Sequence, residues 1–211
     1  MVTQFPTLDS GVTYLDDEGA PAALYRLVGS QLGEAAGPAY WVDARNAARP
    51  DAIDEYTSRR VGRSLRIARA FTAFQHYELV RSLPATVSPR TSLVVVPNVA
   101  SLYATDDVPG HEADAMFEAT LSLLDGVAEA IDVPVVVTAS ERTDRVAAAA
   151  DRTLSAEQTQ AGLRVDGPSF RTDVYWHDWG IQTTIPYWVE LVGAVGADGE
   201  QTAVDPVVLG V

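Results

Sequence analysis

The sequence predicts an α/β fold, with a mostly parallel sheet flanked by helices and antiparallel strands at its C-terminal edge. Short β-rich runs alternate with amphipathic stretches over residues 10–140, a pattern that implies right-handed crossovers and a parallel sheet. Residues 93–96 and 133–137 are the longest apolar runs and have the length of strands, and the continuous run at 93–96 predicts a strand that is buried on both faces. Beyond residue 160 the β-rich runs have short connections, which favours antiparallel hairpins.

The first 140 residues contain predicted strands and helices in alternation. The strands are expected at 12–15, 39–43, 65–71, 92–96 and 133–138. The helices are expected at 22–35, 50–60, 73–83 and 113–131. Pro50 suits the first turn of the second helix, and Pro84 is expected to end the third.

The remaining third of the chain has a different character. Residues 141–160 are polar and rich in alanine, and we expect a helical or mobile segment there. Further strands are predicted at 171–176, 181–185 and 187–195. No linker-like tract divides the sequence, so the prediction is a single domain over 1–211, with an α/β core at 1–140 and C-terminal strands at 161–211.

Composition limits the chemistry that the chain can perform. The 211 residues include 15 basic and 29 acidic side chains, which gives a net charge of −14; every basic residue is an arginine, and there is no cysteine. Without cysteine there is no disulfide and no thiolate nucleophile. Without lysine there is no Schiff-base chemistry and no lysine for a phosphate-binding P-loop.

The acidic excess also predicts the setting in which the protein works. A hydrated carboxylate surface without lysine is typical of halophilic proteins, which stay soluble at high salt. Non-specific binding to nucleic acid depends on Lys and Arg side chains that neutralise phosphates, so this composition disfavours it. No apolar run approaches the roughly 20 residues of a membrane span, and residues 1–9 lack signal-peptide features. We therefore expect a cytoplasmic protein with no membrane partner.

Four segments in order resemble RecA/RadA-type recombinases. Residues 40–53 are similar to that family's second strand and the following loop, and they keep Asp43, Asn46, Arg49 and Pro50 of its pattern. Residues 67–71, Ile-Ala-Arg-Ala-Phe, resemble its Val-Ala-Arg-Ala-Phe segment, and Gln75-His76 resembles its His-Gln pair in swapped order. Residues 93–103 and 135–138 match the strands that carry its later motifs. The resemblance implies a RecA-like ATPase core over residues 10–140.

The same resemblance implies that the nucleotide site is degenerate. The Gly-rich loop and lysine that hold phosphates in the family are replaced here by Asp16, Asp17, Glu18 and Gly19. The family's catalytic glutamate aligns with Arg45, and arginine cannot act as a base. The family's Mg²⁺-associated aspartate aligns with Pro97, and its glutamine after the fifth strand aligns with Ser140. We therefore expect no nucleotide cofactor and no ATPase activity.

The family's two DNA-binding loops align with residues 104–114 and 141–160. The first is acidic and contains no arginine, so it is expected to repel DNA. The second carries Arg142, Arg145 and Arg152, which would share one face of a helix. Because acidic residues interleave with them, a self-paired charged helix is favoured over a DNA contact.

Aromatic residues gather near the C-terminus and have more than one interpretation. They are Tyr175, Trp176, Trp179, Tyr187 and Trp188. Packing on a sheet face is favoured, a protein interface is the second interpretation, and a stacking platform for single-stranded nucleic acid lacks a basic groove nearby.

These observations lead to three functional hypotheses. The favoured one is a non-catalytic RecA-like paralogue that binds protein, either a recombinase in DNA recombination or repair, or copies of itself. The second is an accessory protein for single-stranded DNA. The third is an unrecognised enzyme that uses Asp16, Asp17, Glu18 and Asp43 with a divalent metal at the strand ends. The three histidines lack metal-ligand spacing, so no histidine metal site is expected.

Overall fold

The computed structural model describes residues 5, 7–18, 20–34, 37–54, 64–105, 107–160, 162–168, 170–177 and 180–183, the last two stretches as backbone. Within them lies a nine-stranded sheet in the order β3-β2-β4-β5-β1-β6-β7-β8-β9. The parallel strands are β1 (Gly11–Asp16), β2 (Ala39–Ala44), β3 (Leu65–Ala70), β4 (Leu93–Val96), β5 (Pro134–Val137) and β6 (Arg152–Thr159). The antiparallel strands are β7 (Gly162–Gly167), β8 (Phe170–His177) and β9 (Gly180–Thr183). The predicted fold class is confirmed.

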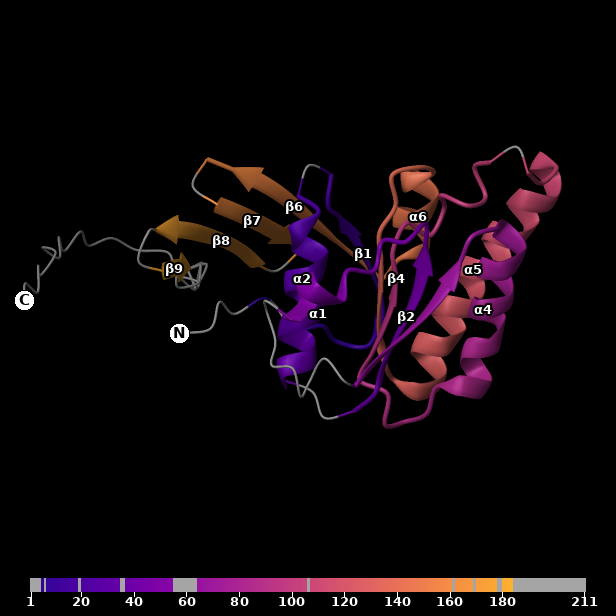
Figure 1. Cartoon of the computed structure of the whole chain (residues 1–211), viewed down its shortest axis with the longest axis horizontal. Coiled ribbons are helices and arrows are strands. Elements are labelled where there is room, and N and C mark those ends of the chain that lie inside the picture. Colours follow the sequence, from indigo (N-terminus) through magenta and orange to yellow (C-terminus); the bar gives the residue numbers. More distant parts are fainter. Residues whose placement is uncertain are drawn as a thin grey trace, which may run out of the picture.

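Helices cover both faces of the parallel part of the sheet (Figure 1). On one face lie α1 (Ala22–Glu34) and α2 (Pro50–Asp54). On the other lie α4 (Ala73–Thr86), α5 (Gly110–Ile131) and α6 (Thr143–Ala149). Chain connections that move one way along the sheet place their helices on the first face, and connections that move the other way use the second, as right-handed crossovers require.

The core consists of two apolar layers, one on each side of the sheet. β4 is fully buried along its length, and its side chains alternate between the layers: Val94 and Val96 face α5, whereas Leu93 and Val95 face α1. Trp41 of β2 is the largest side chain in the α1 layer, and its ring stacks on Tyr25 at 6.2 Å between ring centroids. Phe117 and Tyr103 occupy the α5 layer. This double burial explains why the two valine-rich runs were recognisable in the sequence.

Several element boundaries differ from the sequence prediction. Pro84 lies inside α4, which continues to Thr86; proline removes one helical N–H, and the N–H of Val87 still closes the last turn on Leu83 O at 2.9 Å. α5 begins at Gly110, three residues before its predicted start. α2 is described only to Asp54, because residues 55–63 lie outside the described ranges.

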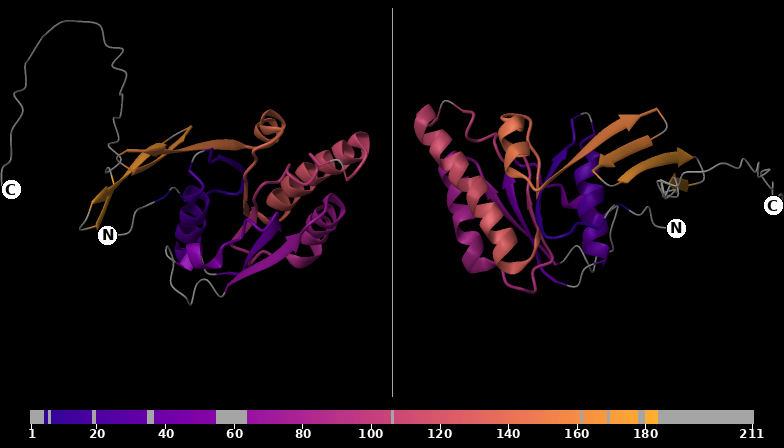
Figure 2. Two further views of the ribbon diagram at one scale, coloured as in Figure 1. Left: turned by 45° about the horizontal axis from the view of Figure 1, so that its top comes forward. Right: turned by 180° about the vertical axis from the view of Figure 1, so that it is seen from behind.

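The segment 141–160 is the largest departure. It contains the seven-residue helix α6 and then the strand β6, which pairs in parallel with β1, so the expectation of one helical or mobile segment is wrong. The reason is a period-two pattern in which Leu154 and Ala156 are buried while Thr153, Ser155 and Glu157 are exposed. From β6 the antiparallel strands extend away from the helices, as both views of Figure 2 show.

Candidate functional site

A crevice opens at the carboxyl ends of β1 and β5. These strands are neighbours, but the chain leaves β1 for α1 on one face and leaves β5 for α6 on the other. Open parallel sheets bind ligands at such a divergence. The crevice has a volume of about 210 Å³ and is lined by Tyr14, Asp16, Asp17, Glu18, Asn98, Ala139, Ser140 and Thr143.

One wall of the crevice is a run of carboxylates. Asp16, Asp17 and Glu18 follow directly from β1, and none of the described residues that line the crevice is basic. The turn is held locally: the N–H of Glu18 donates to Asp16 Oδ1 at 3.4 Å, and the N–H of Ala20 donates to the carbonyl of Asp17 at 2.8 Å. The wall is therefore an anionic surface with a defined shape.

Two pKa shifts report the electrostatics of this wall. Burial, with a smaller contribution from the charge of Asp16, raises the pKa of Asp17 to about 6, although a backbone hydrogen bond opposes the shift. Burial also raises the pKa of the Tyr14 phenol to about 12, and the carboxylates of Asp16, Asp17 and Glu18 add to that effect. Both shifts mean that additional negative charge is unfavourable here. A phosphate group would lose hydration in the same way and would be repelled by the carboxylates.

The rest of the lining supplies neutral polar groups. The N–H of Asn98 donates to Thr138 Oγ1 at 3.0 Å, and the Tyr14 hydroxyl donates to the carbonyl of Ala139 at 3.4 Å. Ser140 Oγ donates to Glu141 Oε2 at 2.8 Å. These described groups bring no positive charge that would offset the carboxylates.

Left-handed backbone conformations gather at the same edge of the sheet. Arg45 and Asn46 follow β2 with φ of 57° and 60°, Asn98 follows β4 with φ of 51°, and Arg142 follows β5 with φ of 54°. Such conformations are unfavourable for residues other than glycine and tend to occur at functional edges. The carboxyl edge is therefore the part of the described sheet where most of this strain is concentrated.

The crevice brings together only part of the predicted site. Asp43 is fully buried away from it, where Oδ1 accepts from the N–H of Ala48 at 3.0 Å and Oδ2 accepts from Arg69 Nε at 3.1 Å. Arg45 Nη2 donates to the carbonyl of Ser101 at 2.9 Å. Pro97 is buried at the end of β4.

Some predicted positions cannot be placed, and some site residues were missed. Gly19 lies outside the described residues. Tyr14, Asn98 and Thr143 line the crevice and were not predicted. Their position at the ends of adjacent strands could have identified Asn98 and Thr143 only if the order of strands in the sheet had been known.

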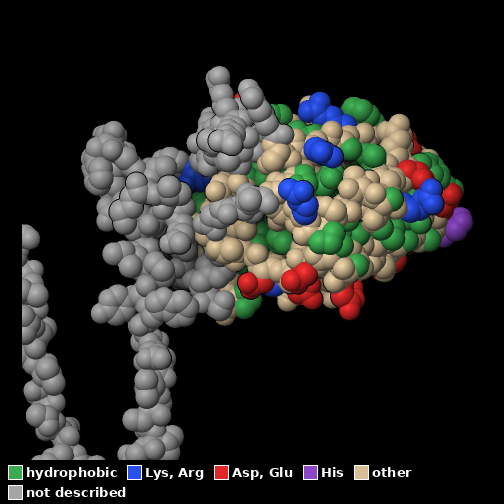
Figure 3. Space-filling model, turned by 90° about the horizontal axis from the view of Figure 1, so that it is seen from below, with side chains coloured by type: hydrophobic (Ala, Val, Ile, Leu, Met, Phe, Trp, Pro, Cys, Tyr) green, Lys and Arg blue, Asp and Glu red, His purple; other side chains and the backbone are tan. Residues whose placement is uncertain are grey.

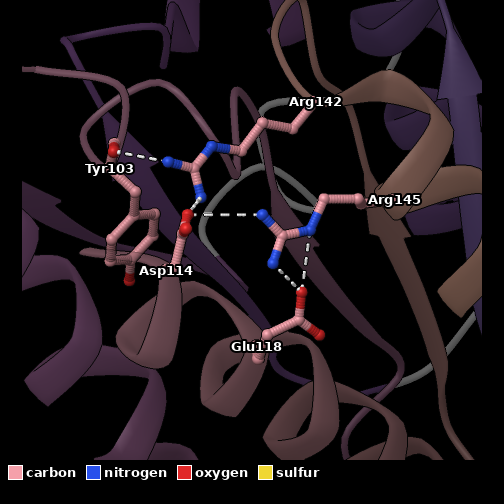
Figure 4. A network of polar contacts seen from close by, with 5 residues as sticks. All are labelled: Tyr103, Asp114, Glu118, Arg142 and Arg145. Atoms are coloured by element: carbon pink, nitrogen blue, oxygen red, sulfur yellow. Dashed lines mark hydrogen bonds and ion pairs between the residues drawn. The ribbon is translucent and has the colours of Figure 1, made fainter. Parts of the chain in front are cut away.

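Two of the three arginines considered for DNA contact are engaged within the protein (Figure 4). Arg142 donates to Asp114 Oδ1 at 2.6 Å and to the carbonyl of Tyr103 at 3.0 Å. Arg145 donates through Nε to Glu118 Oε1 at 2.8 Å and through Nη1 to Asp114 Oδ1 at 3.3 Å. Both guanidinium groups also lie over the ring of Phe117, at 5.1 and 5.2 Å from its centroid. The arginines are paired within the protein, but their partners are carboxylates of α5 and not the interleaved acidic residues of 141–160 that the self-paired helix predicted.

Arg152 is separate from that pair. It begins β6, beyond the end of α6, so the three arginines do not share one helical face as predicted. Its guanidinium donates to the carbonyl of Ser10 at 2.8 Å and lies 3.4 Å from a carboxylate oxygen of Asp9, near the amino end of β1.

The other predicted sites receive little support from the described residues. These residues include no group of three His, Asp or Glu side chains arranged to hold a metal ion. Tyr175 and Trp176 lie in β8, whereas Trp179, Tyr187 and Trp188 lie outside the described ranges. None of the helices in the described ranges has both the length and the apolar character needed to cross a membrane.

Neither the protein-family models nor the curated proteins give a match to this sequence.

Proposed function

We propose that this protein is a non-catalytic RecA-like core that acts by binding protein. The observation that carries the proposal is the crevice between β1 and β5. At the edge where open parallel sheets bind ligands, its described lining includes Asp16, Asp17 and Glu18 and no basic residue. Phosphate binding at such an edge depends on backbone amides and cationic side chains, and this lining opposes it.

The positions that align with the recombinase motifs support the same proposal. Arg45, in the place of the family's catalytic glutamate, directs its guanidinium to the carbonyl of Ser101. Pro97, in the place of the Mg²⁺-associated aspartate, has no side-chain oxygen to offer a metal. Asp43 is kept, but its carboxylate is buried and bonded to Arg69 and to the N–H of Ala48. Arg45 and Asp43 thus have structural roles that do not require nucleotide.

Protein binding is supported by the exposed aromatic residues at the junction of β3 and α4. Phe71 is 67% exposed and Phe74 is 50% exposed, and these are the large hydrophobic side chains most open to solvent in the described ranges. Neighbouring exposed aromatics are typical anchors of protein interfaces. The partner in this proposal is a recombinase of the same family or a second copy of this chain, and the place of action is the cytoplasm.

The proposal is tested with nucleotide and with partner protein in parallel. Millimolar Mg²⁺-ATP is expected to leave the thermal midpoint unchanged, because the described lining of the crevice offers no cationic group to hold phosphate in the folded state. The chain is expected to capture the recombinase of the same cell at high salt, and Phe71→Ala/Phe74→Ala is expected to weaken that capture. Stabilisation by ATP would contradict the non-catalytic assignment. Binding of single-stranded DNA at low salt, without any protein partner, would support the accessory hypothesis instead.

A further inference from the structure

A short segment between β5 and β6 carries part of the lining of the crevice. It runs from residue 139 to residue 150 and contains α6, and we call it the flap (residues 139–150). Ala139, Ser140 and Thr143 of the flap line the crevice. The carboxylate of Asp144, also in the flap, adds to the rise in the pKa of the Tyr14 phenol. The position of the flap therefore affects both the width and the negative charge of the crevice.

The flap is anchored at both ends by hydrogen bonds to the rest of the fold. Directly before it, the carbonyl of Thr138 accepts from the N–H of Val99 at 2.9 Å. Directly after it, the N–H of Asp151 donates to the carbonyl of Val12 at 2.9 Å, and Asp151 Oδ2 accepts from the N–H of Val12 at 2.7 Å. Gly11 has a φ of 107°, and a Cβ there would lie 2.5 Å from Asp151 Oδ2, so the close approach of this carboxylate requires glycine. The flap can therefore move while the strands on either side of it stay in place.

Between these anchors, α6 has few stabilising features of its own. Val146 is the buried residue of this seven-residue helix, whereas eight residues of α5 and four of α4 are buried. Its N-cap, Arg142, has a left-handed backbone with φ of 54° and makes no side-chain capping bond, in contrast to Thr72 of α4. A helix of this length is not stable by itself in water. We therefore expect α6 to belong to the least stable part of the described fold.

Two arginines of the flap join it to α5 (Figure 4), and we call this contact the latch. Arg142 Nη1 lies 2.6 Å from Asp114 Oδ1, and Arg145 contacts both Asp114 and Glu118. Both guanidinium groups also lie over the ring of Phe117. At the end where the parallel strands begin, in contrast, basic side chains lie mostly on one side of the visible face and acidic side chains mostly on the other (Figure 3). Because partly exposed ion pairs are individually weak, the latch can break and form again.

We propose that the flap opens and closes over the crevice and that the latch holds it closed. The structure shows the closed form, and the open form is a minor population in equilibrium with it. Opening moves the lining residues of the flap away from the ends of β1 and β4, so the crevice becomes wider. It also carries Asp144 away from Tyr14, so the crevice becomes less negative. The change is local, because the residues directly before and after the flap stay bonded.

Thiol labelling measures the opening directly, because the chain has no cysteine and an introduced one is its only thiol. Val146→Cys places a thiol on the buried side of α6, and Val80→Cys places a matched thiol on the buried side of α4. At high salt, and relative to the same thiol in the urea-unfolded chain, Val146→Cys is expected to react about tenfold faster than Val80→Cys, or more. Its rate is also expected to depend little on urea below the unfolding transition, because opening exposes much less surface than global unfolding.

The latch is tested by adding Arg142→Gln/Arg145→Gln to the Val146→Cys chain. The labelling rate is expected to rise about tenfold, because the closed form loses its ion pairs and its cation–ring contacts with α5, whereas the open form has none of them to lose. The weak dependence of the rate on urea is expected to remain, since the same local opening exposes the thiol.

Arg49→Gln/Arg81→Gln is the matched control for the latch. It removes the same charge and breaks exposed ion pairs with Asp51 and Glu78, neither of which lies in the flap or on α5. This control is expected to change the labelling rate of Val146→Cys by less than about twofold. An increase equal to that of the latch variant would show that loss of positive charge, and not loss of the latch, opens the flap, and would overturn the proposal.

Two further results would also overturn it. If Val146→Cys and Val80→Cys reacted at the same rate with the same dependence on urea, α6 would leave only when the whole chain unfolds. If loss of both latch arginines left the labelling rate of Val146→Cys unchanged, the latch would not hold the flap. Hydrogen exchange of the amides of 143–149 gives the same comparison without cysteine: exchange is expected to be faster than in α5, and about tenfold faster again in Arg142→Gln/Arg145→Gln.

Discussion

Asp16, Asp17 and Glu18 line the crevice without a basic residue in its described lining, whereas Asp114 and Glu118 on α5 are held by Arg142 and Arg145. Both regions carry carboxylate side chains, but only those on α5 have cationic partners. In the crevice, burial and, to a smaller extent, the charge of Asp16 raise the pKa of Asp17. On α5, Asp114 and Glu118 form ion pairs with Arg142 and Arg145, and both guanidinium groups also lie over the ring of Phe117. These contacts join α5 to α6. The acidic composition therefore combines at least two arrangements, one that repels anions and one that holds the fold together.

Among the paired carboxylates, Asp43 is fully buried, so its removal is expected to have the largest effect on the free energy of unfolding. Asp43→Ala is expected to lower the free energy of unfolding by about 2–3 kcal/mol, because it leaves the N–H of Ala48 without its acceptor and Arg69 without its carboxylate. Denaturant unfolding at high salt measures the change. Asp51→Ala is the control, since its ion pair with Arg49 spans 3.6 Å and both side chains are exposed. Equal effects at the two positions would contradict a structural role for Asp43.

Removing the Asp17 carboxylate from the crevice is expected, in contrast, to raise the free energy of unfolding. Asp17→Asn removes a carboxylate whose pKa is raised from 3.8 to about 6, so the ionised form destabilises the folded protein. Two pKa units correspond to about 3 kcal/mol, and solvent screening of this partly exposed group reduces the expected gain at pH 8 to about 1–2 kcal/mol.

The pH dependence makes this prediction specific. The folded protein binds the Asp17 proton more tightly than the unfolded chain, so this destabilisation is absent below pH 4 and grows as pH rises through 6. The Asn variant is expected to lose that part of the slope when unfolding is measured between pH 4 and 8. If the free energy of unfolding of the Asn variant depended on pH as in the natural chain, ionised Asp17 would not be the cause of the destabilisation.

The smallest effects are expected in the arginine cluster. Arg142→Gln is expected to lower the free energy of unfolding by about 1 kcal/mol, since its side chain is 20% exposed and its guanidinium bonds both Asp114 and the carbonyl of Tyr103. Arg145→Gln is expected to change stability less, because that side chain is more exposed and its pairs are screened by salt. A double-mutant cycle with Asp114→Asn measures the coupling of each arginine. A larger coupling for Arg145 than for Arg142 at high salt would reverse this ranking.

The fold was more predictable than the site. The runs that include Leu93–Val96 and Pro134–Val137 are apolar because both of their faces are buried, and that burial is visible in the sequence. β6 was missed because its alternation is carried by only Leu154 and Ala156 among polar residues. The crevice depends on the sheet order, which places β1 beside β5 although they are far apart in the sequence. The resemblance predicted Asp16, Asp17 and Glu18, but only the fold could show that Tyr14 and Asn98 line the same crevice.

The position of β1 in the sheet affects how the chain can be made. β1 lies between β5 and β6, and its first and last residues pair with Pro134 and Ser155. Val12 and its partner Asp151 are 139 residues apart, so at about 5–20 residues per second β1 waits roughly 7–28 s on the ribosome for that partner. Such distant pairings also slow folding after release. The first 90 residues carry 10 acidic and 10 basic side chains, so the net charge of −14 comes entirely from the later part of the chain. Repulsion between nascent chains therefore develops only as the segments that pair with β1 are being made.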